Sequence, residues 1–254
     1  MTENTSKLHL ITIPISHYCE KARWALDRAK VPYIEKQYLP VFHLLPVKRA
    51  GGGDSVPVLV TPQKVLPDST DILQWIDTQV PDSLHLYPSD PVLRREVEEW
   101  EEFFDLGLGV AGRLWMYSYV LNDPSLVILF SKKHQISRVQ KWLLPTLFPV
   151  VKKLIQKTIG LRDGSREYAF AKIEAAFARV ATTLSDGREY LVGNVFTAAD
   201  LTFAALSAAI LLPENYGVEL PRLEDMPEAM RGQIADWRKH RAGVFAARLY
   251  EKRK

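Results

Sequence analysis

Cysteine is almost absent from this sequence, and so are long hydrophobic runs. The single cysteine, Cys19, excludes a disulfide framework within the chain and a cysteine-rich zinc site. No stretch approaches the roughly 18 consecutive apolar residues of a membrane-spanning helix, and residues 1–7 are polar, unlike a signal peptide. A lone cysteine also suits a reducing compartment. We therefore expect a cytoplasmic protein that binds no metal.

The sequence also lacks a large excess of either positive or negative charge. The net charge of +3 is small for 254 residues, and the six tryptophans and ten tyrosines are scattered, so nucleic acid is not an expected partner. The glycine triplet at 51–53 lacks the Gly-Lys-Ser/Thr ending of a phosphate-binding loop, and no dinucleotide fingerprint is present. With 47% apolar and 25% charged residues, the composition is that of an ordinary globular protein.

The most informative stretch is the beginning of the chain. Residues 8–13 favour a strand, Pro14 ends it, and Ser16 is a good N-cap for a helix that continues through Trp24 and Leu26. Backbone N–H groups converge at such a helix start and the dipole is positive there, so an anion or a thiolate can be held. Two simpler interpretations remain open: Ser16 only caps the helix, and Cys19 is a small buried hydrophobic residue.

The rest of the first third alternates between strands and helices. Further strands are expected at 31–38, 55–60 and 65–66, with a helix beginning near Asp68 and Ser69. Because prolines and glycines interrupt residues 39–54, we expect an irregular, mobile loop there. Pro57 stands inside an apolar strand, where proline is unfavourable unless the strand lies at an edge or the bond is special.

After a linker at 81–91 the sequence becomes helical. The expected helices are 91–121, 124–157, 164–185, 197–212 and 227–241, with a possible last turn at 244–251. Strands followed by helices indicate two domains, an α/β domain at 1–87 and an all-α domain at 88–254. Thr197 and Asp200 have the spacing of a capping box before a very apolar helix, which should therefore be central.

Segment 124–165 combines lysines with apolar residues. A basic amphipathic helix can lie on a membrane surface, but more often it packs its apolar face on a neighbour and leaves its lysines in water. We favour packing and do not expect membrane contact. Pro145 and Pro149 should kink or split this helix.

Four motifs in this order resemble those of the glutathione S-transferase superfamily, and their spacing covers nearly the whole chain: Ser16-x-x-Cys19, Val56-Pro57, Asp68-Ser69 and Thr197-x-x-Asp200. The resemblance implies a thioredoxin-like N-terminal domain, an all-helical C-terminal domain and a homodimer.

The resemblance also implies roles for five residues. Ser16 would contact the glutathione sulfur and stabilise its thiolate. The Val56 backbone would pair with the cysteinyl part of the tripeptide, and Pro57 would follow a cis peptide bond. Asp68 would receive the γ-glutamyl ammonium, and Ser69 the carboxylate.

The function implied is conjugation of the glutathione thiolate to hydrophobic electrophiles, a detoxification reaction with glutathione as co-substrate and no metal. The electrophile pocket would lie between the domains and would be lined by Trp115, Met116 and Tyr119, although a role in the core is equally open for these three residues. A contact from Lys48 is a guess, and segment 124–165 could cover or reshape the pocket.

Two other functions stay open at this point. A glutathione-dependent thiol oxidoreductase would use Cys19, although Ser16 occupies the position of the attacking cysteine. A non-catalytic protein could keep the fold to bind a ligand or partner, because fold does not determine function.

Overall fold

A mixed four-stranded sheet forms the N-terminal part of the computed structural model, which describes residues 8–132 and 134–253. The strands are β1 (Leu8–Thr12), β2 (Tyr33–Gln37), β3 (Val58–Val60) and β4 (Val65–Leu66), in the order β2-β1-β3-β4. β1 is parallel to β2 and antiparallel to β3, and β4 is antiparallel to β3. All four expected strands are therefore present, but β3 begins only after Pro57, which has no N–H for a ladder.

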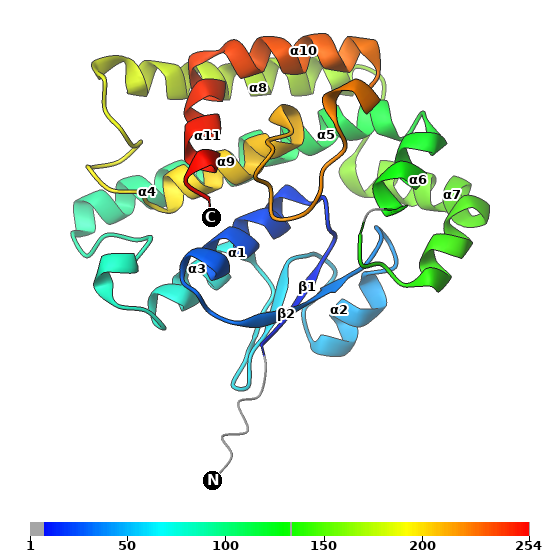
Figure 1. Cartoon of the computed structure of the whole chain (residues 1–254), viewed down its shortest axis with the longest axis horizontal. Helices are drawn as coiled ribbons and strands as arrows, with labels where there is room; N and C mark the ends of the chain where they lie inside the picture. Colours follow the sequence, from blue (N-terminus) through cyan, green and yellow to red (C-terminus); the bar gives the residue numbers. More distant parts are fainter. Residues whose placement is uncertain (1–7, 133, 254) are drawn as a thin grey trace.

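Helices cover both faces of this sheet (Figure 1). Successive strand residues point to opposite faces, so Leu10 packs with α1 (His17–Arg28) and α3 (Ser69–Asp77), whereas Ile11 packs with Val47 of α2 (Leu44–Ala50). The face that carries α1 also meets the helical domain, because α1 packs on α9 (Ala198–Leu211). The start of α1 consequently lies where the two halves of the molecule meet.

Helix α2 corrects the expectation of an irregular loop at 39–54. Pro46 is its third residue, in the first turn, where backbone N–H groups have no partner within the helix in any case. Gly51 has φ +83° and forms the left-handed C-cap, so the glycines end the helix instead of preventing it.

The rest of the chain is helical, as predicted. The helices of the C-terminal half are α4 (Pro91–Phe103), α5 (Val110–Val120), α6 (Pro124–Lys132), α7 (Arg138–Ile159), α8 (Ser165–Thr183), α9, α10 (Glu228–Lys239) and α11 (Arg241–Glu251). In the described part of the chain, the 3₁₀ turns η3 (Leu184–Asp186) and η4 (Leu223–Asp225) lie between helices of this half, and η1 (Asp82–Leu84) lies between α3 and α4. The chain is thus a thioredoxin-like α/β domain followed by an all-α domain, and the predicted boundary at 87 falls between η1 and α4.

Three details of these helices differ from expectation. The run 91–120 contains a π-helical segment, η2 (Phe104–Gly109), between α4 and α5. The predicted helix 124–157 is divided between Lys132 and Arg138, whereas Pro145 and Pro149 lie inside α7. Both prolines are exposed, so the carbonyls that lose their N–H partner can be hydrated. The expected last turn is a complete helix, α11.

Helix α9 is the centre of the core, and all of its residues are buried. Its capping box forms as predicted: the Asp200 carboxylate accepts from the backbone N–H of Thr197 at 2.9 Å, and also from that of Leu191 at 2.8 Å. One continuous apolar core joins the sheet domain to the helical domain. Within residues 8–132 and 134–253, no helix has the length and apolar character needed to cross a bilayer.

Candidate functional site

The turn between β1 and α1 presents Ser16 at the start of the helix. Its N–H donates to the carbonyl of Ile13 at 3.0 Å, and its Oγ accepts from the Cys19 N–H at 3.4 Å. The cap predicted from the sequence is therefore real. It does not use up the hydroxyl, because the Oγ–H remains a donor while Oγ accepts. Ser16 is half-buried and lines a cleft, so its hydroxyl can serve both the helix and a ligand.

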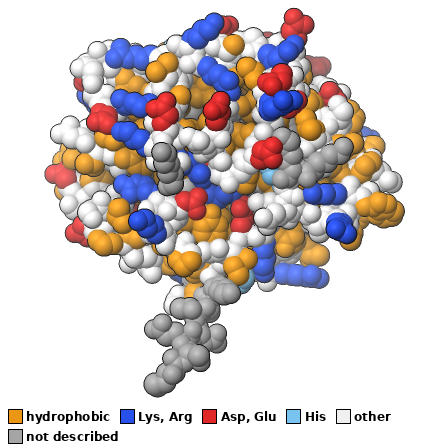
Figure 2. Space-filling model, viewed as in Figure 1, with side chains coloured by type: hydrophobic (Ala, Val, Ile, Leu, Met, Phe, Trp, Pro, Cys, Tyr) orange, Lys and Arg blue, Asp and Glu red, His pale blue; other side chains and the backbone are white. Residues whose placement is uncertain are grey.

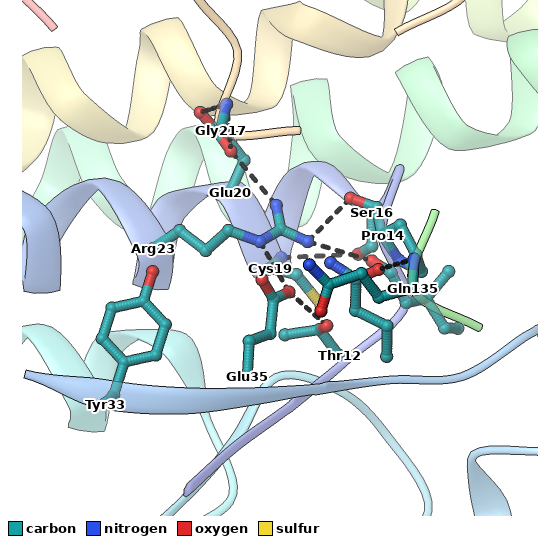
Figure 3. Close-up of polar contacts among 12 residues, drawn as sticks. Thr12, Pro14, Ser16, Cys19, Glu20, Arg23, Tyr33, Glu35, Gln135 and Gly217 are labelled. Atoms are coloured by element: carbon teal, nitrogen blue, oxygen red, sulfur yellow. Dashed lines mark hydrogen bonds and ion pairs between the residues drawn. The ribbon is translucent and has the colours of Figure 1, made fainter. Parts of the chain in front are cut away.

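Arg23 lies about two helical turns further along α1, and its side chain reaches back to the backbone before Ser16 (Figure 3). Its Nη2 donates to the carbonyl of Pro14 at 2.7 Å. The buried guanidinium also pairs with Glu20 at 3.1 Å and with Glu35 of β2 at 2.8 Å. Two carboxylates on different elements thus fix the arginine, and the arginine fixes the backbone just before Ser16.

Cys19 faces the interior and is fully buried. Burial raises the pKa of its thiol to about 11, despite the nearby Arg23 charge. A thiol of this kind is hardly ionised at neutral pH and is inaccessible to a substrate disulfide. The arrangement favours the interpretation of Cys19 as a small hydrophobic residue and disfavours a redox role.

The cleft beside Ser16 has a volume of about 430 Å³, within the range of small-molecule sites. Val56 lies on its wall, and the Val56–Pro57 peptide bond is cis, as the resemblance implies. Lys48 and His43, from α2 and the residue before it, line the same cleft. The helix that was not expected at 39–54 therefore places Lys48 on the cleft.

One face of α5 forms the opposite wall through Arg113, Met116 and Tyr117; the last two lie three and four residues after Arg113. Trp115 and Tyr119 lie on another face. Trp115 is fully buried and its Nε1 donates to Gln233 of α10 at 2.7 Å; the ring of Tyr119 lies 4.0 Å from the Arg166 guanidinium. Of the three residues expected at the electrophile pocket, only Met116 is therefore on the cleft.

Helix α7 closes the remaining side. Its residues Leu154, Ile155, Thr158 and Ile159 line the cleft. A second, apolar cavity of about 50 Å³ lies between this wall and α6, and it shares Ile15, Tyr117 and Ile155 with the cleft. Segment 124–165 thus contributes walls to both the cleft and the smaller cavity.

The second predicted anion site is the start of α3. Asp68 is the N-cap, and its Oδ1 accepts from the Thr70 N–H at 2.7 Å; Ser69 is buried at the first helical position. Asp68 itself is exposed, so its second carboxylate oxygen faces solvent or a ligand. A helix start next to an exposed carboxylate offers both an anion site and a cation partner.

A buried network lies directly behind this helix start. Lys21 Nζ, with a fully buried side chain, is 2.7 Å from both Glu101 Oε1 and Asp105 Oδ2 and 3.1 Å from Thr70 Oγ1. The other oxygen of Asp105 is buried without a hydrogen-bond partner among the described residues. Burial raises the pKa of Asp105, and the nearby Asp68 raises it further. Three carboxylates, those of Asp68, Glu101 and Asp105, therefore lie near the α3 N-terminus, and the Lys21 ammonium pairs with the last two.

Electrostatics inside the cleft favour an anion. Arg113 lines it, and Arg113 Nε is buried without a partner in the described part of the chain. Burial, together with the Arg113 charge, lowers the pKa of His17 to about 3, so His17 is neutral and its Nε2, 2.9 Å from the Gly109 carbonyl, donates there. The charged residues that line the cleft, Arg113, Lys48 and Asp54, then carry a net positive charge.

Sequence reasoning did not identify Arg113, Tyr117, Lys21 or Asp105. The first two have the same helical spacing as Met116, so choosing the face of Met116 would have found them. Lys21 and Asp105 carry no local signal, because 84 residues separate them and only the packing of α1 against η2 brings them together.

Comparison with known proteins was made on sequence and on structure. Residues 10–84 match the family model of the glutathione S-transferase N-terminal domain. The comparison with curated proteins gave no match.

Solved structures with a similar fold share 15–20% of their residues with this chain. A glutathione S-transferase of Ceriporiopsis subvermispora in complex with glutathione is 16% identical, with TM-score 0.64, and 98% of each chain is covered. The β-etherase LigF of Sphingobium sp. strain SYK-6 is 18% identical, with TM-score 0.59 and coverage of 98% of this chain and all of the other. A Methylobacterium radiotolerans glutathione S-transferase in complex with glutathione sulfonate is 20% identical, with TM-score 0.54 and coverage of 95% and 94%.

Proposed function

We propose that this chain, whose residues 10–84 match the glutathione S-transferase N-terminal domain and whose fold resembles that of solved glutathione S-transferases, conjugates the glutathione thiolate to a hydrophobic electrophile. One observation carries the proposal. The Ser16 hydroxyl at the start of α1 and the backbone of Val56 line a single cleft between the domains, with Arg113 opposite. A thiol placed there would meet a hydroxyl donor, a helix N-terminus and a cation.

The proposed chemistry needs the glutathione thiol as an anion. A hydrogen bond from Ser16 to the charged form would contribute about 1.5–3 kcal/mol, which lowers the thiol pKa by about one to two units. The positive helix end and Arg113 act in the same direction. The thiolate then forms an S–C bond with the electrophilic carbon, and the leaving group departs with the electron pair of the bond that breaks.

The peptide part of glutathione would extend from Val56 to the start of α3. Its γ-glutamyl ammonium would meet Asp68, and its α-carboxylate would meet the N–H groups of Ser69 and Thr70. The buried Asp105 would add negative charge near the ammonium. We include the homodimer in the proposal because the resemblance implies it. We include the cytoplasmic location because a single free cysteine suits a reducing compartment.

The electrophile would occupy the apolar side of the cleft, next to Ile15, Met116 and Tyr117. Apolar walls of this kind bind a ligand mainly by removing its surface from water, and they leave its chemical identity loosely specified.

Calorimetry with glutathione tests binding, and the kcat of conjugation tests the chemistry. Asp68→Ala and Asp68→Asn should both weaken binding; Asn keeps the cap acceptor, so a loss shared by both variants reports the charge rather than the helix. Ser16→Ala should keep most of the affinity but reduce kcat about 10- to 100-fold, the consequence of a thiol pKa one to two units higher.

Failure takes two distinguishable forms. A folded native protein that does not bind glutathione would contradict the proposal as a whole. Glutathione binding without turnover over a broad panel of electrophiles would support the non-catalytic alternative instead.

A further inference from the structure

Helix α7 has a charge composition unlike the rest of the molecule. Its 22 residues include five basic side chains and no acidic one: Arg138, Lys141, Lys152, Lys153 and Lys157. The whole chain carries +3, so everything outside α7 together carries −2. The net positive charge of this protein is therefore due to one helix.

The outward face of the same helix is apolar. Its inner residues Leu144, Val151 and Ile155 are buried, as packing requires. The outward-facing apolar residues stay exposed by the following fractions: Val139 64%, Trp142 78%, Leu147 37%, Val150 57% and Leu154 43%. A helix that only packs on a neighbour normally turns a polar face to water. The expected packing thus accounts for one face of α7 and leaves the other unexplained.

Trp142 is the clearest exception. Trp24, Trp100, Trp115 and Trp237 are at most 5% exposed and Trp75 is half-buried, whereas Trp142 is 78% exposed. Tryptophan next to basic side chains is typical of helices that lie at the boundary between lipid headgroups and acyl chains.

The exposed residues form a stripe. Val139, Trp142, Val150 and Leu154 follow one another at intervals of three, eight and four residues, which keeps them on one side of a helix. The exposed Lys153 and Lys157 belong to the same side. At 1.5 Å per residue the stripe is about 22 Å long. In Figure 2, hydrophobic and basic side chains lie next to each other at the edge where Figure 1 places α7.

We propose that α7 is a docking surface for an anionic lipid bilayer. The helix would lie parallel to the membrane, with Trp142 and Val150 in the interface and the basic side chains on the lipid phosphates and carboxylates. A second copy of the chain is a poor occupant of this face, because two α7 helices placed together would bring Lys153 and Lys157 of one copy near the same lysines of the other, and α7 has no acidic residue to offset them.

The surface continues into the cleft. Leu154 is both part of the exposed stripe and part of the cleft wall. Docking would therefore place the mouth of the cleft at the lipid surface, where apolar compounds concentrate. The docking itself does not depend on the proposed transferase activity.

Vesicle sedimentation with the full chain tests this surface. We expect binding to vesicles of phosphatidylcholine mixed with phosphatidylserine, weak binding to phosphatidylcholine alone, and loss of binding as salt is raised. Because Trp142 is the exposed tryptophan, binding should shift its emission to shorter wavelength and protect it from an aqueous quencher; Trp142→Phe should remove that signal.

Matched variants locate the contact. Lys153→Gln combined with Lys157→Gln should weaken binding about 30-fold, from about 1 kcal/mol for each basic residue near an anionic surface. Lys172→Gln on α8 is the control for an exposed lysine elsewhere and should leave binding unchanged. Trp142→Ser should also weaken binding, whereas Tyr168→Ser, at an exposed aromatic residue of α8, should not.

Three results would overturn the proposal. They are no sedimentation with the phosphatidylserine vesicles, equal sedimentation with both lipid compositions, and binding that the α7 variants leave intact. A self-association that Trp142→Ser abolishes, in the absence of vesicle binding, would assign the face to a second copy instead. All variants are at exposed positions, so a circular dichroism spectrum and melting curve like those of the native protein confirm that each one is folded.

Discussion

Arg23 Nη2 donates to the carbonyl oxygen of Pro14 at 2.7 Å, and this contact fixes the turn that presents Ser16. The guanidinium is 1% exposed and also pairs with Glu20 and Glu35. One planar cation with several fixed donors can satisfy two carboxylates and a carbonyl together, which an ammonium cannot do with the same geometry.

Arg23→Lys should therefore damage both stability and the site. The charge is kept, but the contact with the Pro14 carbonyl and one carboxylate pairing are lost, so we expect the free energy of unfolding to fall by about 2–4 kcal/mol. The pKa of bound glutathione, read from the pH dependence of kcat, should rise because Ser16 is no longer held. Arg28→Lys, near the end of the same helix, is the control; an equal loss at both positions would contradict the special role of Arg23.

Gly109 is a point of close contact between the two domains. A Cβ there would overlap Tyr18 Oη and would lie 3.0 Å from Leu206 Cδ1. Gly109→Ala should destabilise the protein by about 1–3 kcal/mol, because neither α1 nor α9 can move away without disturbing the core. Urea unfolding measures the change, and combining Gly109→Ala with Tyr18→Phe should recover part of it.

Gly107 lies in the same π-helical segment and has nothing within 4 Å of the position of a Cβ. Gly107→Ala should leave stability unchanged or raise it by up to about 1 kcal/mol through the lower entropy of the unfolded chain. Comparable destabilisation by both substitutions would mean that the segment is sensitive to any side chain, and that the Tyr18 contact is not the cause.

Much of this fold could be predicted because its signals are local. Ser16, Asp68 and the Thr197–Asp200 box are caps whose partners lie within three residues. Helix α2 was missed because proline and glycine were taken as breakers wherever they stood. Pro46 is harmless in a first turn, and Gly51 is favourable at the C-cap.

The wall of the cleft was harder to predict for a different reason. Choosing Met116 over Trp115 requires knowing which side of α5 faces the sheet domain, and both residues are apolar. Lys21 reads as a surface lysine of an amphipathic helix, yet it is fully buried between Glu101 and Asp105. Contacts over such sequence distances follow from the packing of domains and leave no periodic pattern.

Acid should destabilise the protein through His17. Burial and Arg113 lower the pKa of His17 to about 3 in the folded protein, below its ordinary 6.5. Between these values the unfolded chain binds more protons than the folded one, so stability is complete above about pH 6.5 and falls as the pH drops. From pH 7 to pH 5 the loss due to His17 should be about 2 kcal/mol.

Urea unfolding of His17→Gln at several pH values measures this contribution. Glutamine can still donate to the Gly109 carbonyl but does not titrate, so the variant should lose less stability on acidification than the native protein. His134, whose pKa burial lowers to about 4, contributes with the same sign in both proteins. An identical pH dependence for the variant and the native protein would show that His17 is not the group responsible.

Cys19 should be unreactive in the folded protein, and it is the only cysteine, so the measurement is direct. Burial raises its pKa from 9.0 to about 11. This shift alone reduces the thiolate fraction near pH 8 about 100-fold, and the full burial of the side chain slows the reaction further. An aromatic disulfide reagent should accordingly label the native protein very slowly and should label one thiol rapidly after unfolding in urea.

Cys19→Ala should retain transferase activity, because Ser16 and not Cys19 would contact the glutathione sulfur. Rapid labelling of the native protein, or a glutathione-dependent thiol reductase activity that disappears in Cys19→Ala, would favour the oxidoreductase function over the transferase function.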